Sequence, residues 1–438
     1  MKEQFLHFVW QYHRFNHREL KTTNHQIIQI VDYGQLNHHD GPDFLHAKVR
    51  IGEVLWVGNI EIHIKSSDWD LHKHSDNPLY KNVILHVVYE HDKEISNTDF
   101  PTLELRGRIP KSIYHRYLSL IESTYTLPCH HLIPDIDPYV INMYTYRLTT
   151  ERLESKVGQI EQILQLHNND FEQVAFIWLA RYFGVGVNSD AFQQVATQTQ
   201  HQWLIRISHE KHGTAALLLG SAGFLKNIPD QDNYIKNLIV QFEHYRNKWN
   251  IVPIEEYWWK WKIGRPASFP TLKMAQLAQL LEGENSIFNM IIDPKNLMDN
   301  VKHIVLDEFW DKHYLLNKPS VQRQKSISLN FAQRLVINVT VPMMIVYGKY
   351  IDDTTWVERA LETLEQLKPE KNRITKVMSQ SGLPNENALH SQALLHLKNE
   401  YCDQKKCLNC QIGNQIMRTP IHKIEEAYTP HSTHSAYI

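Results

Sequence analysis

The sequence predicts an α+β protein, in which a strand-rich N-terminal part precedes a larger and mostly helical region. Apolar residues at helical spacing between Phe5 and Tyr12 predict an opening helix. Short runs rich in β-branched and aromatic residues follow, separated by turn-forming stretches, and they predict strands over 27–31, 44–51, 54–65, 83–90 and 102–106. Gly52 and Glu53 form a tight connection, which favours a hairpin between the second and third of these strands.

A proline-rich stretch over 128–138 predicts a domain boundary, because proline interrupts regular structure. We therefore expect one α/β domain over 1–127 and an α-helical region over 128–438. Helical spacing in that region predicts helices over 152–166, 171–183, 214–224, 271–281, 356–367 and 387–401. The apolar stretch 335–347 is shorter than the roughly 20 residues that cross a membrane. We expect it to form a buried core helix.

The composition is that of a soluble protein and excludes a strongly basic one. Of 438 residues, 42% are hydrophobic and 21% charged, and the net charge is −2, so contact with nucleic acid needs a local basic patch. The start lacks the pattern of a signal peptide, and there are only 4 cysteines. We expect a cytoplasmic protein without membrane association, whose cysteines are free thiols or metal ligands rather than disulfides.

An acid, an imidazole and an ammonium alternate along the third predicted strand. Side chains two residues apart share a face of a strand, so Glu61, His63 and Lys65 point the same way. Asp43 follows a Gly-Pro turn at the start of the preceding strand, and a hairpin brings it towards Glu61. Two converging carboxylates suit Mg²⁺ or Mn²⁺, an ion that polarises a phosphoryl oxygen and activates water. The alternative is a solvated strand face.

Histidines are concentrated near these carboxylates. Fifteen of the 27 histidines lie between His7 and His131. The connection between the third and fourth predicted strands contains His72, His74 and Asp76, and the fourth strand contains His86. We interpret these four residues as accessory metal ligands or phosphate contacts.

This order of elements resembles the PD-(D/E)xK nuclease superfamily. The resemblance implies a restriction-endonuclease-like mixed sheet, with Asp43 and Glu61 as the two metal-binding acids. The superfamily has a lysine two residues after the glutamate, where this chain has His63, and Lys65 lies one pleat further on. The chain also departs in the connection to the fourth strand, which contains Pro78 and little helical periodicity. The implied activity is metal-dependent cleavage of DNA or RNA, with His63 or Lys65 orienting water.

Three of the four cysteines form a compact motif near the C-terminus. Cys402, Cys407 and Cys410 have C-x4-C-x2-C spacing, which suits a single metal ion or an iron–sulfur cluster. The fourth ligand is expected to be Cys129, with His131 and His422 as alternatives. Zn²⁺ and a 4Fe–4S cluster both fit, and the alternative is a set of free thiols. Some PD-(D/E)xK nucleases are similar in carrying a cluster on a C-terminal triplet and one remote cysteine, but their remote cysteine precedes the nuclease motifs.

Residues 255–270 interleave tryptophans with lysines and an arginine. Such a segment suits stacking on single-stranded nucleic acid, but packing of a helix end with snorkelling lysines is the favoured interpretation.

Several segments also resemble one bacterial family that has only a domain-of-unknown-function label. They cover nearly the whole chain and comprise 41–44, 60–63, 265–270, 335–342 and 402–413. Three hypotheses follow. The first is a metal-dependent nuclease, and the second is a catalytically inactive nucleic-acid-binding or scaffold protein with a structural Zn²⁺ or iron–sulfur site. The third is another class of metal enzyme, which uses His63, His72, His74 and His86.

Overall fold

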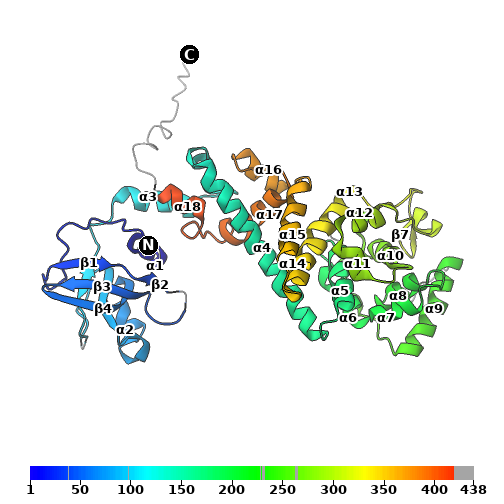
Figure 1. Ribbon diagram of the computed structural model, residues 1–438, viewed down its shortest axis with the longest axis horizontal. Helices are drawn as coiled ribbons and strands as arrows, with labels where there is room; N and C mark the ends of the chain where they lie inside the picture. Colours follow the sequence, from blue (N-terminus) through cyan, green and yellow to red (C-terminus); the bar gives the residue numbers. More distant parts are fainter. Residues whose placement is uncertain (38, 97, 227, 229–231, 262–264, 419–438) are drawn as a thin grey trace, which may run out of the picture. The chain divides into compact units, whose positions relative to one another are not determined.

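The computed structural model describes residues 1–37, 39–96, 98–226, 228, 232–261 and 265–418 (Figure 1). The chain forms two compact units. Among the described residues, the sheet unit comprises 1–144, 373–383 and 395–418, and the helical unit comprises 145–372 and 384–394. This division differs from the boundary that the sequence predicts between residues 127 and 128, because the C-terminal cysteine segment returns to the unit that contains the sheet. The protein is thus α+β, as the sequence predicts.

The sheet is mixed, and its strand order is β1-β3-β4-β5-β6, with β2 paired to β3. The pairs β1/β3 and β3/β4 are antiparallel, whereas β4/β5 and β5/β6 are parallel. The strands are β1 (Ile28–Asp32), β2 (Gln35–Leu36), β3 (Phe44–Ile51), β4 (Val54–Lys65), β5 (Val83–Glu90) and β6 (Thr102–Glu104). All five predicted strands are present, and the predicted hairpin turns at Gly52, whose φ of 58° favours glycine.

Two features position side chains at the middle of β4. The helix α1 (Glu3–Gln11) packs against β4 and fully buries Phe5 and Leu6. The β3/β4 register shifts between Phe44 and Ala47, and such bulges redirect side chains and are frequent beside active sites.

The crossover from β4 to the parallel strand β5 contains little helix. It holds a four-residue helix, α2 (Asp68–Leu71), and two 3-10 turns, His74–Asp76 and Pro78–Tyr80. The sequence predicts this weak helicity around Pro78. Trp69 is buried beneath the crossover, and its indole Nε1 donates a hydrogen bond to Ser75 Oγ at 2.9 Å. The crossover is therefore anchored although it is irregular.

The remainder of the sheet unit is helical. Its elements are α3 (Lys111–Ile121), a 3-10 turn at His130–Asp135, the start of α4 (Pro138–Leu166), α16 (Arg373–Gln380), a π-helix at Leu397–Cys402 and α18 (Gln411–Arg418). The boundary between the units falls within α4, which begins well before the predicted 152.

The helical unit encloses one large apolar core. Its principal helices are α5 (Phe171–Phe183), α6 (Ser189–Gln198), α7 (His201–Arg206), α8 (Gly213–Ser221), α9 (Asn233–Trp249), α10 (Pro270–Leu281), α11 (Ile287–Ile292), α12 (Pro294–Lys302), α13 (Leu329–Leu335), α14 (Val341–Tyr350), α15 (Thr355–Gln366) and most of α17 (Ala388–His396). A short hairpin joins β7 (His313–Leu315) to β8 (Lys318–Pro319). One helical run among the described residues, Leu329–Tyr350, has the length and composition of a membrane span, and 72% of its apolar window is buried. That burial confirms the predicted core helix.

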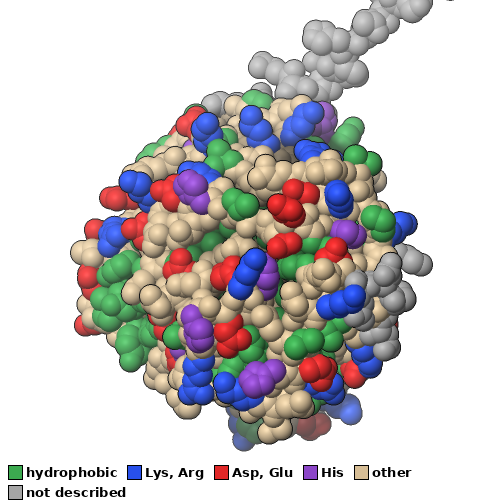
Figure 2. Space-filling model, turned by 90° about the vertical axis from the view of Figure 1, so that its right-hand side faces the viewer, with side chains coloured by type: hydrophobic (Ala, Val, Ile, Leu, Met, Phe, Trp, Pro, Cys, Tyr) green, Lys and Arg blue, Asp and Glu red, His purple; other side chains and the backbone are tan. Residues whose placement is uncertain are grey.

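The aromatic and basic segment 255–270 packs into this core. Trp259 is buried, and its Nε1 donates to Ala222 O at 2.9 Å. Trp258 and Trp261 pack against the same core, whereas Tyr257 is exposed. Lys262 lies outside the described residues. Figure 2 shows basic and acidic side chains interspersed over one face of the protein, without a basic stripe in that view. The packing interpretation of the segment is supported.

Candidate metal centre

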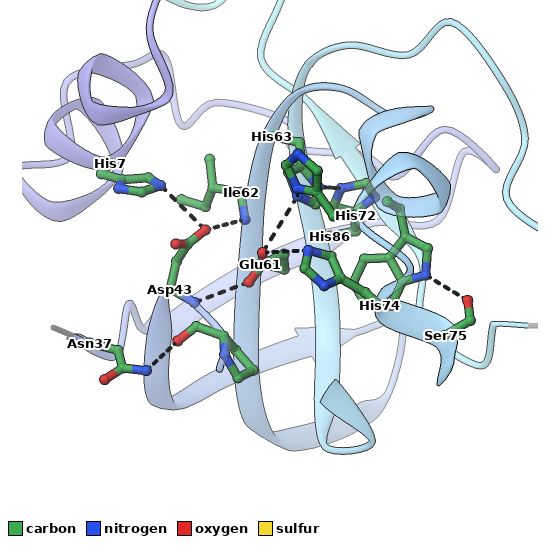
Figure 3. A network of polar contacts seen from close by, with 12 residues as sticks. His7, Asn37, Asp43, Glu61, Ile62, His63, His72, His74, Ser75 and His86 are labelled. Carbon is green, nitrogen blue, oxygen red and sulfur yellow. Dashed lines mark hydrogen bonds and ion pairs between the residues drawn. The ribbon is translucent and has the colours of Figure 1, made fainter. Parts of the chain in front are cut away.

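Two carboxylates meet where β3 begins beside β4 (Figure 3). The Asn37 amide donates to Pro42 O at 3.0 Å and fixes the Gly-Pro turn before Asp43. The backbone N–H of Asp43 donates to Glu61 Oε2 at 3.1 Å, and Asp43 Oδ2 accepts from Ile62 N at 2.9 Å. The predicted convergence of Asp43 and Glu61 is therefore built into the pairing of the two strands.

Two imidazoles approach the other oxygen of Glu61, and a third lies beside one of them. Glu61 Oε1 lies 3.3 Å from His74 Nε2 and 3.5 Å from His63 Nε2. His63 Nε2 lies 3.2 Å from His72 Nδ1. One ligand atom from each of the three histidines lies within 4.8 Å of the other two. Strand β4 supplies Glu61 and His63, and the crossover supplies His72 and His74 (Figure 3). Three imidazole nitrogens thus lie close together, and Glu61 Oε1 lies beside two of them.

The hydrogen bonds among these histidines do not satisfy every ring nitrogen. Because a neutral imidazole has one donor and one acceptor, His63 can pair with His86 through one nitrogen and with His72 through the other. His74 Nε2 is buried, and its approach to Glu61 lacks hydrogen-bond geometry, so it has no hydrogen-bond partner among the described residues. Buried polar atoms without partners are uncommon in native proteins, and an ion is one of the groups that satisfies them.

His86 contacts the Nδ1 atom of the His63 ring. His86 is fully buried on β5, opposite Glu61 in the β4/β5 register, and its Nε2 lies 2.8 Å from His63 Nδ1. With its proton on Nδ1, His63 donates to His86 and directs its Nε2 lone pair towards Glu61. Metal-binding histidines commonly use their second nitrogen in this way. His86 is thus placed to orient a ligand rather than to be one.

Burial determines the electrostatics of the cluster. It lowers the pKa of His63 to about 2, with further contributions from His86 and His74. It also lowers the pKa of His86 to about 3. Both rings are therefore neutral at physiological pH, which is the form that binds metals. Burial, followed by the charge of Asp43, raises the pKa of Glu61. A cation at the cluster would offset the repulsion between these two carboxylates.

Helix α1 adds two residues that the sequence reasoning missed. His7 Nε2 lies 3.3 Å from Asp43 Oδ2. Burial alone lowers the pKa of His7, but the hydrogen bond and charge of Asp43, together with Glu3 and Glu61, outweigh it and raise the pKa. Burial and then Asp43 raise the pKa of Glu3. The available signal was the four-residue spacing of Glu3 and His7, which places both on one face of the opening helix.

Two predicted site residues lie away from the cluster. Lys65 and Asp76 are exposed, and the described residues show no contact between the Lys65 ammonium and either carboxylate. Lys65 shares the face of Glu61, as predicted, but four strand residues correspond to roughly 13 Å. Its backbone N–H instead donates to Asp68 Oδ2 at 2.9 Å. The structure thus brings together Asp43, Glu61, His63, His72, His74 and His86.

The four cysteines form a separate buried group in the sheet unit. The alternative fourth ligand His131 is exposed, and His422 lies outside the described residues.

Comparison with known proteins identifies a family without giving an activity. The sequence model of the DUF2851 family, which is described as a protein of unknown function, matches residues 3–373. No curated protein and no solved structure matches the chain significantly. The matched region contains every residue of the histidine and carboxylate cluster and ends before the cysteine triplet.

Proposed function

We propose that this chain, which belongs to the DUF2851 family, is a metal-dependent hydrolase of phosphodiesters. The observation that carries the proposal is the grouping of one nitrogen each of His63, His72 and His74, with Glu61 Oε1 within 3.5 Å of the His63 and His74 nitrogens. A second carboxylate, Asp43, is hydrogen-bonded directly to this group through its backbone.

The donor set favours a transition metal over Mg²⁺. Imidazole nitrogen suits Zn²⁺ and Fe²⁺, whereas Mg²⁺ requires oxygen ligands in octahedral geometry. Three imidazoles and one carboxylate oxygen therefore favour Zn²⁺ or Fe²⁺ over the Mg²⁺ or Mn²⁺ expected from the carboxylates alone. When bound, such an ion polarises a phosphoryl oxygen and lowers the pKa of water.

The protein residues have distinct roles in this proposal. Glu61, His63, His72 and His74 hold the ion, and His86 fixes the orientation of the His63 ring. Asp43 is held by the N–H of Ile62 and lies within 3.3 Å of His7. The raised pKa of His7 keeps its ring protonated to a higher pH than an isolated histidine. We assign His7 as the group that delivers a proton to the leaving oxygen, which is the usual role of a histidine acid.

The phosphodiester substrate is inferred from the arrangement of the elements. A helix, antiparallel strands with Gly-Pro-Asp43 on one and Glu61 on the next, and a parallel strand after a crossover occur in the order expected of a restriction-endonuclease-like domain. DNA or RNA is accordingly the proposed substrate. His63 stands where the PD-(D/E)xK superfamily has lysine, and here it contributes a ligand rather than a cation.

The test is a cleavage assay on protein loaded separately with Zn²⁺, Fe²⁺, Mn²⁺ or Mg²⁺. Its substrates are single- and double-stranded DNA and RNA, and bis(p-nitrophenyl) phosphate. We expect cleavage with Zn²⁺ or Fe²⁺ that the double substitution His63→Ala with His74→Ala abolishes. The matched control is His25→Ala, because His25 is an exposed histidine of the same unit.

Absence of cleavage with every ion and substrate would contradict the hydrolase. Salt-sensitive nucleic-acid binding without turnover would favour the inactive binding protein instead.

A further inference from the structure

The four cysteines of the chain lie in the sheet unit, although Cys129 is far from the others in sequence. Cys129 precedes the 3-10 turn His130–Asp135, Cys402 ends the π-helix Leu397–Cys402, and Cys410 precedes α18. All four are buried, with between 6% and 9% of their surfaces exposed, and none forms a disulfide.

Cys129 lies within electrostatic range of the other three thiols. Burial is the largest influence on the Cys129 thiol and raises its pKa, and the next three are the charges of Cys410, Cys402 and Cys407. The ordering indicates that Cys129 shares one low-dielectric environment with the whole triplet. His131 is exposed, which makes Cys129 the better candidate for a fourth ligand.

The triplet loop has a tightly determined backbone. Lys406 N donates to Tyr401 O at 2.9 Å, and Cys410 N donates to Lys406 O at 3.1 Å. A Cβ on Gly413 would lie 2.1 Å from the carbonyl oxygen of Cys407, so this close approach requires glycine. The preceding π-helix is a rare conformation that frequently marks functional sites.

Contacts across the unit hold this loop against the segment that contains Cys129. The Lys405 ammonium donates to the carbonyl oxygen of Ser123, and Arg116 Nη1 donates to Ile416 O at 2.9 Å. Lys398 and Lys405 also place positive charge near Cys402, where it opposes the effect of burial on the thiol pKa. The surroundings therefore partly offset the negative charge that four thiolates would carry.

We propose that Cys129, Cys402, Cys407 and Cys410 form a tetrathiolate centre for a soft metal, either one Zn²⁺ ion or an iron–sulfur cluster. Each thiol releases its proton as its sulfur binds the metal, and no disulfide forms or breaks. Four buried thiols in one compact unit, none of them in a disulfide, offer the ligand set of structural zinc and of 4Fe–4S sites. The centre joins the segment after α3 to the C-terminal segment, which lies beyond the DUF2851 match, and so stabilises the sheet unit.

The test measures thiol protection and metal content on full-length protein purified without oxygen. We expect either about one additional zinc per chain or about four iron with matching sulfide and a brown colour. In native protein all four cysteines should resist alkylation, as read by mass spectrometry. A chelator, with ferricyanide in the case of iron, should make them reactive without denaturant. Buried thiols without metal would not respond to the chelator, and that result would overturn the proposal.

Two substitutions separate a ligand from a residue that is only buried. Cys129→Ser should remove most of this metal, and His131→Ala should retain it. Because Cys129→Ser could impair folding, the chelator experiment on the unmodified chain remains the deciding one. Retention of full metal content by folded Cys129→Ser would exclude Cys129 as a ligand. Metal assigned to the histidine site is distinguished by its persistence in Cys129→Ser and its loss in the double His63→Ala, His74→Ala variant.

Discussion

The histidine cluster of the sheet unit and the Gln173 network of the helical unit are both buried polar groups, but they are satisfied differently. In the helical unit, buried Gln173 uses its amide fully: Nε2 donates to Ala196 O at 2.9 Å and Thr199 O at 3.2 Å, and Oε1 accepts from His201 N at 2.8 Å. Each donor of this network meets an acceptor. In the histidine cluster of the sheet unit, His74 Nε2 and His86 Nδ1 have no hydrogen-bond partner among the described residues.

The difference separates a structural polar group from a binding site. A complementary buried network stabilises the fold by itself, whereas buried nitrogens without partners cost free energy until another group, such as an ion, satisfies them. The comparison leads to opposite expectations for substitutions in the two units. Changes to the cluster should remove ligand and activity at little cost in stability, and changes to the Gln173 network should do the reverse.

The largest expected effect is on activity, from Glu61→Gln. The amide keeps the shape of the side chain but loses the charge that holds the cation, so metal-dependent turnover should fall by about 10³-fold or more. Turnover and metal content are measured together, with His25→Ala as the control. Unchanged turnover in Glu61→Gln would remove Glu61 from the site.

The second prediction concerns stability, from Gln173→Met in the helical unit. The substitution leaves two carbonyl groups and one N–H unsatisfied, which should lower the free energy of unfolding by about 2–4 kcal/mol. Denaturant unfolding measures this loss of stability. The metal content per folded chain should be unchanged. Loss of metal from the cluster in this variant would contradict the distinction between the two units.

The third prediction concerns proton transfer. His7→Gln should reduce turnover about 10- to 100-fold while metal binding is retained, because His7 contacts Asp43 rather than the three clustered imidazoles. Turnover is measured against pH, and the alkaline limb of the profile should change in the variant. A parallel loss of metal would indicate that His7 is itself a ligand.

The fourth prediction concerns the stability of metal-free protein against pH. The folded-state pKa values of His63 and His86 are lowered, so their contribution is present above about pH 6.5 and is lost as the pH falls below it. The folded-state pKa of Glu61 is raised to about 9. Its contribution to the free energy of unfolding is therefore fully present below about pH 4.5 and is lost as the pH rises from there to about 9. Each group changes the free energy of unfolding by at most about 1.4 kcal/mol per pH unit.

Glu61→Gln and His86→Phe separate the two limbs. The stability difference between wild type and Glu61→Gln should vary between about pH 4.5 and pH 9, and the difference between wild type and His86→Phe should vary between about pH 3 and pH 6.5. Chemical unfolding of chelator-treated protein at several pH values measures both differences. A flat difference in each case would show that these groups are not buried as described.

The smallest expected effect is that of Lys65→Ala. Lys65 is exposed and is separated from Glu61 by roughly 13 Å of strand. Turnover and metal affinity should therefore change by less than about twofold, as for an exposed residue without contacts. A large loss of turnover with metal retained would restore the role that the nuclease resemblance implies for this lysine.

Much of the sheet was predictable because strand composition and turn residues are local signals. The ranges 44–51, 54–65 and 83–90 agree with β3, β4 and β5, and the pairing of Asp43 with Glu61 follows from the hairpin between β3 and β4. The alternation of Glu61 with His63 on one face was also correct. Alternation alone, however, does not measure distance along a strand, which is why Lys65 was grouped with them.

The other parts of the candidate site and of the fold depend on tertiary contacts. The positions of His72 and His74 are set by an irregular crossover that no periodicity describes, and His7 approaches Asp43 only because α1 packs against β4. The return of the C-terminal segment to the sheet unit is likewise a long-range contact. Local sequence patterns could not indicate these contacts, and the metal site expected from the cysteine spacing stays a prediction.

The most direct test of the central claim is an anomalous diffraction measurement at the zinc and iron edges on crystals of the metal-loaded protein. The account predicts a peak about 2.0–2.2 Å from Glu61 Oε1 and from the clustered nitrogens of His63, His72 and His74. A peak only at the four cysteines, with the three imidazoles contacting one another or water, would contradict it.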